Sequence, residues 1–315
     1  MVITMRANNV LGIIYSNAYD SVLSELTNAR TMGSVPFGGR YRLIDFALSN
    51  LVNCGINKVG IITKSNYQSL MDHIGTGKPW DLSRKRGGMF LLPPFNNSHT
   101  GMYRDRIQAL RGIMRFLEQS KEEYIVLMDT NVVCNFDLND MCRAHTESGA
   151  DITIAYHHGR APRLDDLMTF TFEENQKVAK IALDPKTSNP VDYAMNIILI
   201  SKALLTRLIN NAVSLNQDSF VRDVIQHNLK RLNIYGYEVS GFTSVFDSLQ
   251  SYYDISMSLL DPANCQELFT RERPVYTKVR DDMPAIYGLG STVKNSLVAD
   301  GCSIDGEVEN CILFR

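Results

Sequence analysis

The sequence predicts an α/β protein with a large domain over residues 1–262 and a small β-rich domain over residues 263–315. Two observations predict the large domain: the chain exceeds one average domain in length, and short β-rich runs alternate with helical patterns. A third predicts the small domain, because helical periodicity disappears after Asp261 and Pro262. We therefore expect a mostly parallel sheet with helices, followed by an all-β region.

Composition is typical of a folded soluble protein. Hydrophobic residues make up 44% and charged residues 21%, which is not the balance of a disordered chain. The net charge of −2 and the pI of about 6.3 argue against a nucleic-acid-binding protein, which usually carries a basic face. The short basic run at residues 84–88 is therefore interpreted as a solvated loop.

The cysteines and the N-terminus bear on the cellular compartment. The six cysteines form no C-x-x-C pair and no zinc-type spacing with histidine, so we interpret them as reduced core thiols. No charged segment precedes an apolar one at the N-terminus, and no apolar run approaches the ~20 residues of a membrane span. We expect a cytoplasmic protein with no membrane or nucleic-acid partner.

Hydrophobic periodicity predicts each element of the large domain in turn. The run at 124–129 is apolar throughout, which suits a strand covered on both faces. The later β-rich runs lie close together, so we expect some antiparallel pairing there. The expected elements are strand 10–15, helix 43–54, strand 58–63, helix 67–74, helical segment 104–119, strands 124–129, 151–158, 168–172, 177–183 and 193–201, and helices 202–209 and 220–229.

The loop after the first strand, SNAYDSV at residues 16–22, contains no glycine. A nucleotide-binding α/β protein usually has a glycine-rich loop there, because a residue without Cβ lets backbone N–H groups curl around a phosphate. Most other loop signals fall within residues 75–104, and ligand loops often follow strand ends. The run GTGKP at 75–79 lacks P-loop spacing and is interpreted as a surface turn.

A six-residue period marks the small domain. This period is typical of a β-helix, in which each short rung buries one side chain and stacks on the next. An ordinary hairpin region is the alternative. The uncapped last rung at Arg315 suggests a truncated sequence or an edge covered by another subunit. The residues in this pattern are Val298 with Ile304, then Cys302, Val308 and Phe314, with Gly301 and Gly306 at candidate corners.

The segments at residues 36–50 and 53–74, PFGGRYRLIDFALSN and NCGINKVGIITKSNYQSLMDHI, resemble the bacterial glucose-1-phosphate adenylyltransferases. The resemblance implies a dinucleotide-binding-like nucleotidyltransferase domain, a left-handed parallel β-helix, incomplete here, and a tetramer. It also implies a reaction in which ATP and glucose 1-phosphate give ADP-glucose and pyrophosphate. The match continues in order near Asp129, Ile200, Asp223, Tyr253 and Leu297.

The resemblance also indicates which catalytic positions have changed. The family's phosphate loop G-G-x-G-x-R-L and its following lysine correspond to uncharged or acidic residues here, namely Asn17, Ala18, Asp20, Val22 and Met32. A carboxylate near a triphosphate is repulsive. On the sugar-phosphate side, the family's lysine corresponds to Asp184, and GMYRDR around Tyr103 and Arg104 replaces the family's G-T-A-D stretch.

One of the family's two Mg²⁺ carboxylates remains. Asp129 matches the first aspartate, whereas Ser244 stands at the second. Asp247 lies three residues away, an offset that reverses its face on a strand. Arg30 and Arg42 match cationic effector positions, and Arg40 is a further candidate because guanidinium groups suit phosphates.

These changes predict a regulatory, non-catalytic subunit of the GlgD type, which assembles with a catalytic glucose-1-phosphate adenylyltransferase subunit in a heterotetramer. No cofactor is expected for this chain alone, and Mg²⁺ is expected in the catalytic partner. Two alternatives stay open: an active nucleotidyltransferase with a divergent site that uses Asp129, and a free-standing sensor of a sugar phosphate or nucleotide-sugar.

Overall fold

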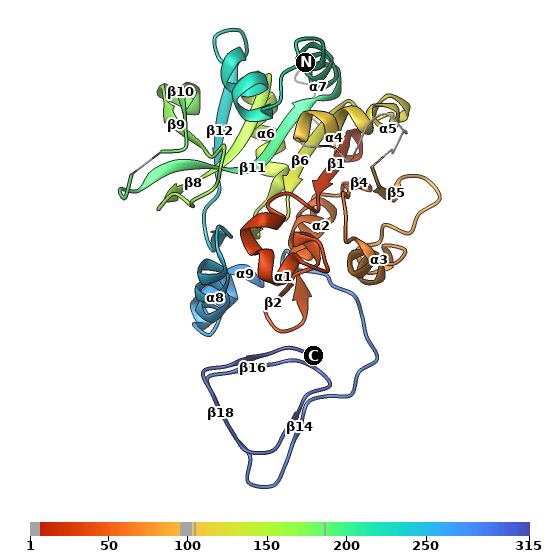
Figure 1. The fold of residues 1–315 in the computed structure, drawn as a ribbon, viewed down its shortest axis with the longest axis vertical. Coiled ribbons are helices and arrows are strands. Elements are labelled where there is room, and N and C mark those ends of the chain that lie inside the picture. The colour runs from red at the N-terminus through yellow and green to blue at the C-terminus, as the bar shows by residue number, and fades with distance from the viewer. Residues whose placement is uncertain (1–6, 95–102, 104, 186) are drawn as a thin grey trace.

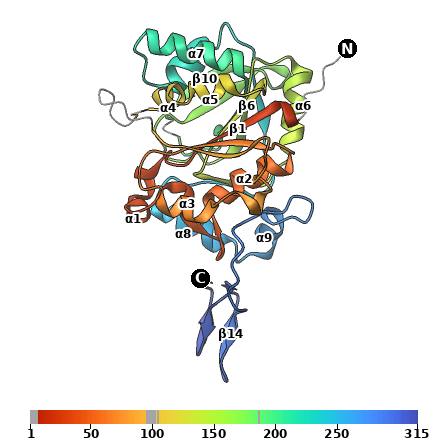
Figure 2. The same cartoon turned by 90° about the vertical axis from the view of Figure 1, so that its right-hand side faces the viewer.

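The computed structural model describes residues 7–94, 103, 105–185 and 187–315. Its main body contains a nine-stranded sheet with helices on both faces, and the C-terminal segment extends away from this body (Figures 1 and 2). Arg104, together with residues 95–102 of the predicted loop region, lies outside the described residues. Within the described part of the chain, no helix has the length and apolar character needed to cross a membrane.

The sheet is mixed: the expected antiparallel pairing is present, but the expectation of a mostly parallel sheet is wrong, because four of the eight strand pairs that the described residues form are antiparallel. The path runs β10-β9-β11-β6-β1-β4-β5, and β8 joins β11 to β12. Pairs β1–β4, β1–β6, β4–β5 and β8–β12 are parallel, whereas β11 pairs antiparallel with β6, β8 and β9, as does β10 with β9. The strands are β1 (Val10–Tyr15), β4 (Lys58–Ile62), β5 (Gly88–Leu92), β6 (Tyr124–Asp129), β8 (Ile152–Gly159), β9 (Met168–Phe172), β10 (Val178–Leu183), β11 (Val191–Ser201) and β12 (Ile234–Glu238).

Alternate residues of the central strands face two hydrophobic cores. Ile14 of β1 packs in the core that contains residues of α2, α3 and α6, and Ile13 packs in the core of α4, α5 and α7. Figure 2 shows α4, α5 and α7 on one side of the sheet and α2 and α3 on the other. Their bounds are α2 (Leu43–Asn53), α3 (Gln68–Ile74), α4 (Arg106–Gly112), α5 (Met114–Gln119), α6 (Leu138–Ser148) and α7 (Lys202–Ser214).

Two predicted helical segments differ in detail. The described part of segment 104–119 forms two helices, because the chain leaves helical geometry at Ile113 (φ −101°, ψ 8°), directly after Gly112. The helix predicted at residues 220–229 is present, but as a π-helix over Phe220–Ile225 followed by a 3₁₀ turn over Gln226–Asn228. The remaining short elements are α1 (Ser24–Thr27), β2 (Pro36–Phe37), β3 (Tyr41–Arg42), β7 (Val132–Cys134), β13 (Thr243–Val245), α8 (Leu249–Ser258), α9 (Pro262–Leu268) and the 3₁₀ turns Ala7–Asn9, Asp20–Leu23, Met32–Ser34, Lys78–Trp80 and Glu174–Gln176.

The C-terminal segment traces a triangular outline below the main body (Figure 1). Its first three strands pair with its last three, and all three pairs are parallel. A hairpin pairs antiparallel, so the hairpin alternative is wrong for this region. The strands are β14 (Ile286–Tyr287), β15 (Thr292–Lys294), β16 (Leu297–Val298), β17 (Ser303–Ile304), β18 (Glu307–Glu309) and β19 (Ile312–Leu313).

Candidate functional site

Two of the segments singled out by sequence meet at the carboxyl ends of neighbouring parallel strands. β1 lies between β4 and β6, so the chain passes to one side of β1 and later to the other. The crevice outside the strand ends at such a reversal is the usual ligand site of open α/β sheets. Residues 16–22 follow β1, and Asp129 is the last residue of β6. The site is built on these two strand ends.

Hydrogen bonds within the structure hold the loop after β1. The side-chain oxygen of Asn17 accepts the backbone N–H of Lys64 at 2.7 Å. Its amide nitrogen donates to the carbonyl oxygen of Ser65 at 3.1 Å and to the Asp20 carboxylate at 2.6 Å. The other oxygen of Asp20 accepts the backbone N–H of Met32 at 2.7 Å. The polar side chains of this loop are thus hydrogen-bonded to other groups of the same chain.

Burial changes the acidity of this loop. It raises the pKa of Asp20 from 3.8 to about 6, although hydrogen bonds from Asn17 and from the Met32 backbone oppose the shift. At neutral pH most Asp20 side chains are therefore ionised. A negative charge at this position disfavours an anionic ligand in the same loop.

The other changed positions of the loop carry packing side chains. Met32 is fully buried in a core shared with Phe37, Val22 packs at the edge of the same core, and Ala18 packs against the core on the other face. Tyr19 adopts φ 64°, a left-handed conformation that L-residues rarely occupy. At these positions, which the resemblance aligns with the family's phosphate loop, the side chains pack against the hydrophobic cores.

Arg106 neutralises Asp129. The Arg106 guanidinium donates a hydrogen bond to the Asp129 carboxylate, and the two side chains are 14% and 0% exposed. Burial acts to lower the pKa of Arg106, but the Asp129 charge outweighs it and the pKa is raised. The sequence analysis missed Arg106, which begins α4 and lies 23 positions before its partner.

Aromatic and amide side chains enclose this ion pair. The Arg106 guanidinium lies 4.6 Å from the centroid of the Tyr15 ring and 5.7 Å from that of Phe220. Asn196 donates a hydrogen bond of 2.9 Å to the hydroxyl of Tyr19. Burial raises the pKa of Tyr19 to about 12, so its hydroxyl stays protonated. We call Tyr15, Tyr19, Arg106, Asp129 and Asn196 the polar cluster.

The bend that presents Asn196 lies within β11. Its backbone has φ 54°, and the register between β11 and β8 shifts between Ala194 and Ile198. Asparagine tolerates left-handed backbone better than most residues, which explains its place at this irregularity. This bulge in β11 turns the Asn196 side chain toward Tyr19.

The Mg²⁺ site that the resemblance implies does not fit these residues. Asp129 is committed to Arg106, and Ser244 lies in β13, paired with Val133 of β7. Asp247 instead accepts the backbone N–H of Arg163 at 2.7 Å. Among the described residues, no group of three or more histidine, cysteine, aspartate or glutamate side chains could hold a metal.

Asp184 lies on the rim of a separate cavity of about 600 Å³. The residue has φ 49°, and its carboxylate accepts the backbone N–H of Leu167 at 3.1 Å. Arg160 and Arg163 also line this cavity, and neither makes an ion pair with a residue that the structure describes. Two arginines and two aspartates, Asp165 and Asp184, therefore line this cavity, and Asp184 is the position that the resemblance aligns with the family's lysine.

The structure separates the three effector candidates into two groups. Arg42 donates to the backbone oxygen and hydroxyl of Ser69 at 2.7 and 2.8 Å. Burial lowers the pKa of Arg42, and the nearby charges of Arg30 and Arg280 lower it further. Arg40 instead points to Asp300 of the C-terminal segment, at 3.9 Å. Arg30 and Arg42 thus belong to one cationic group, which includes Arg280.

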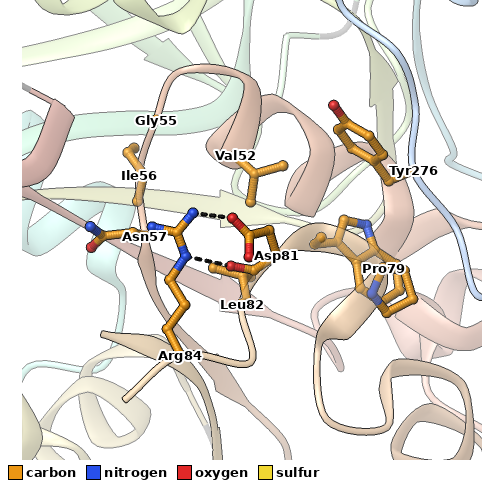
Figure 3. Close-up of a pocket in the computed structure, with 10 residues that line it drawn as sticks. Val52, Gly55, Ile56, Asn57, Pro79, Asp81, Leu82, Arg84 and Tyr276 are labelled. Atoms are coloured by element: carbon orange, nitrogen blue, oxygen red, sulfur yellow. Dashed lines mark hydrogen bonds and ion pairs between the residues drawn. The ribbon is translucent and has the colours of Figure 1, made fainter. Parts of the chain in front are cut away.

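A smaller hollow of about 230 Å³ adjoins the turn at Asp81 (Figure 3). Arg84 donates to the Asp81 carbonyl oxygen at 2.8 Å, and its guanidinium also pairs with the Asp81 carboxylate. Figure 3 shows these groups facing each other. The charges that line this hollow are thus paired, and none of the predicted site residues lies in it.

Comparison with known proteins gives a consistent picture. A family model described as nucleotidyl transferase matches residues 12–247. The glycogen biosynthesis protein GlgD of Bacillus subtilis is 36% identical over 99% of this chain and 81% of its own length. GlgD of Geobacillus stearothermophilus is 37% identical over 98% and 80%. The glucose-1-phosphate adenylyltransferase of Clostridium acetobutylicum is 31% identical over 98% and 83%.

Proposed function

The chain belongs to the nucleotidyl transferase family, and we propose that it acts in glycogen synthesis as a non-catalytic, regulatory subunit of glucose-1-phosphate adenylyltransferase. Its similarity to two GlgD proteins and to an adenylyltransferase supports the pathway. The ion pair between Arg106 and Asp129 is the single observation that carries the regulatory assignment. A nucleotidyl transfer depends on charge neutralisation by metal and cationic side chains. Here an internal arginine already neutralises the retained carboxylate.

The loop after β1 supports the same proposal. Asp20 and Asn17 bond to each other and to backbone groups, and Met32 is buried in the core. A triphosphate would have to displace these bonds and approach the Asp20 carboxylate. Mg²⁺ and the catalytic groups would then come from the partner subunit.

The partner would be a catalytic glucose-1-phosphate adenylyltransferase subunit, in a heterotetramer. The C-terminal strands would form the first coils of a left-handed β-helix, for which their three parallel pairs are the support. Arg30 and Arg42 would bind a phosphorylated effector, with Arg40 as a weaker candidate because it faces Asp300.

Mixing experiments test the proposal. Purified catalytic subunit is titrated with this chain, while light scattering follows assembly mass and initial rates follow ADP-glucose formation. We expect a mixed oligomer whose apparent substrate affinity or effector response changes several-fold, since coupling between sites is usually ~1–3 kcal/mol. A mixed oligomer with the kinetics of the partner alone would leave only a structural role.

One rival gains some support from the cavity lined by Arg160 and Arg163. In this cavity of about 600 Å³, the two arginines suit a phosphate and the carboxylates of Asp165 and Asp184 could accept hydrogen bonds from sugar hydroxyls, as in a free-standing sensor. In the same titration, the absence of any mixed oligomer would favour the sensor. Binding of glucose 1-phosphate to the isolated chain, lost in Arg160→Ala, would strengthen that conclusion.

A further inference from the structure

A chain segment without helix or strand, residues 270–278, leads from α9 toward β14, and we call it the strap (Figure 1). Two side chains of α2 hold its backbone. The Ser49 hydroxyl accepts the backbone N–H of Tyr276 at 2.9 Å, and the Asn53 amide donates to the carbonyl oxygen of Pro274 at 3.1 Å. Ser49 and Asn53 are four positions apart, so they share one face of α2. The strap lies on this face.

Asn135, which follows β7, holds the start of the strap. Its amide nitrogen donates to the carbonyl oxygens of Leu268 and Arg273, both at 2.8 Å. Its side-chain oxygen accepts a hydrogen bond from the Arg273 guanidinium at 3.2 Å. Asn135 is 8% exposed, so these bonds are largely shielded from water. Polar side chains of the main body thus fix the strap, mostly through its backbone.

Apolar packing beneath the strap is thin. Val275 packs against a hydrophobic core, whereas Tyr276 is 37% exposed. A cavity of about 230 Å³ adjoins Tyr276, and another of about 250 Å³ adjoins Glu272 and Arg273. The buried hydroxyl of Thr277 has no hydrogen-bond partner among the described residues. Segments with few buried apolar contacts open at a lower free energy than the core, so we expect the strap to detach while the sheet stays folded.

Helix α3 contacts both the effector candidate Arg42 and the strap. The Arg42 guanidinium donates to the carbonyl oxygen and hydroxyl of Ser69 at 2.7 and 2.8 Å. About one turn later, the backbone carbonyl oxygen of Asp72 accepts a hydrogen bond from the ammonium group of Lys278, the last residue of the strap. Because α3 has only seven residues, a displacement of Ser69 would also move Asp72. Loss of the Arg42 bonds should therefore weaken the hold on Lys278.

The same end of the strap contacts the C-terminal segment. Arg315, which follows β19, donates to the carbonyl oxygen of Lys278 at 3.4 Å and pairs with Asp282 at 3.5 Å. Release of Lys278 would thus free a group to which the end of the C-terminal segment is bonded.

We propose that the strap is a releasable link through which α3 couples Arg42 to the position of the C-terminal segment. With Arg42 bonded to Ser69, α3 holds Lys278 and the strap is docked on α2. A phosphate group that takes the Arg42 guanidinium competes with Ser69 and shifts the strap toward release. This last step rests on the proposed function, because it requires an effector at Arg42, whereas the link between Arg42 and Lys278 does not.

Hydrogen exchange of the full chain tests the link without an effector. Arg42→Ala should speed exchange of the strap amides by ~5-fold or more, while the amides of β1 keep their protection. Lys278→Ala should have a similar effect. The double variant should exchange little faster than either single variant, because both changes remove the same coupling. Arg207→Ala, at an exposed position of α7 on the other side of the sheet, is the matched control.

Asn53→Ala tests the docking itself. It removes a direct bond to the strap, so strap exchange should again rise while β1 stays protected. The proposal is overturned if the strap of Asn53→Ala exchanges at the unaltered rate, or if β1 loses protection to the same extent. Effects of Arg42→Ala and Lys278→Ala that simply multiply in the double variant would overturn it as well.

Inorganic phosphate separates this inference from the proposed function. Calorimetry measures phosphate binding to the unaltered chain and to Arg42→Ala, and hydrogen exchange is repeated at saturating phosphate. Binding that depends on Arg42 and speeds strap exchange supports both. Binding that depends on Arg42 but leaves the strap unchanged overturns the step from effector to strap. Absence of binding contradicts the effector site of the proposed function, and the variant series above then decides whether the link between Arg42 and Lys278 exists.

Discussion

Asp129 matches the aspartate to which the resemblance assigns a Mg²⁺-binding role, yet its carboxylate pairs with Arg106 inside the protein. The pair is almost fully enclosed, so both charges depend on each other rather than on water. A buried ion pair contributes little net stability as a unit, but losing one member leaves the other charge unpaired. This asymmetry makes the pair testable.

Replacing Arg106 with leucine should therefore destabilise the protein by ~3–5 kcal/mol, because Asp129 would remain buried without a counter-charge. Urea denaturation measures the change as a difference in the free energy of unfolding. The control is the double variant Arg106→Leu/Asp129→Asn, which removes both charges and should recover most of the loss. A single variant within ~1 kcal/mol of the unaltered protein would contradict the ion-pair assignment.

The raised pKa of Asp20 predicts that the free energy of unfolding depends on pH. Its folded pKa of about 6 lies above the usual 3.8, so folding favours the protonated form. The resulting stability is complete below pH 4 and is lost as the pH rises through 6. Asp20→Asn does not titrate, so it should gain about 1–2 kcal/mol relative to the unaltered protein between pH 4 and 7, after allowance for solvent screening.

The measurement compares chemical denaturation of the two proteins at a series of pH values. The gain should level off above pH 7, because Asp20 is then fully ionised in both states. Curves that stay parallel over the whole range would mean that burial does not perturb this carboxyl.

The proposed effector site can be tested at Arg42. Arg42→Ala should weaken the response of the mixed enzyme to a phosphorylated effector by ~1.5–3 kcal/mol, as expected when a charge-assisted hydrogen bond is lost. Arg84→Ala is the matched control, because Arg84 pairs with Asp81, is not an effector candidate and should leave the response nearly unchanged. An unaltered effector titration in Arg42→Ala would assign Arg42 to its hydrogen bonds with Ser69 alone.

At the scale of elements, the C-terminal strands depend on few buried side chains. Within residues 286–315, Ile304 of β17 and Ala299 are the two buried hydrophobic residues. Ile304→Asp should expose the paired strands, so amide protection at β14 to β19 should fall by ~10-fold or more while that of β1 stays the same. Hydrogen exchange resolves the two regions. Equal loss in both would mean that the segment and the sheet unfold as one unit.

Elements of the large domain were predictable because their hydrophobic patterns are strong and local. β6 is an uninterrupted apolar run, and α2 is a mostly apolar segment between two strand-like runs. Both are buried, and both can be recognised from the residues of the segment itself. Interruptions of regular helix were harder to predict from the sequence. Gly112 alone is a weak indication that α4 ends there, and the π-helix at Phe220–Ile225 has no distinctive hydrophobic period.

The site was predictable only in part. The resemblance predicts which positions differ from those of the adenylyltransferases, but it does not indicate what the side chains at those positions contact in this protein. Arg106 meets Asp129 only after α4 folds over the end of β6, and Asn196 reaches Tyr19 through a bulge in a strand. Such contacts depend on tertiary packing, which the spacing of residues along the chain does not encode.

For the whole molecule, the nucleotidyl transferase fold is present, and the proposed function adds that the chain itself does not catalyse the transfer. The sheet, the loop position and the parallel C-terminal pairs remain, and the charges at the site are paired internally. Under the proposed function, the chain would act on a catalytic partner through contacts and coupled conformational states.

The most direct test is the rate of ADP-glucose formation by this chain alone, with ATP, glucose 1-phosphate and Mg²⁺ at saturating concentrations. The account predicts a rate at background, because losing even one stabilising charge typically costs ~10²-fold and several are absent here. A catalytic relative assayed at the same concentration provides the positive control. Robust Mg²⁺-dependent turnover that co-elutes with the pure chain, and that persists after any catalytic subunit is removed, would contradict the account.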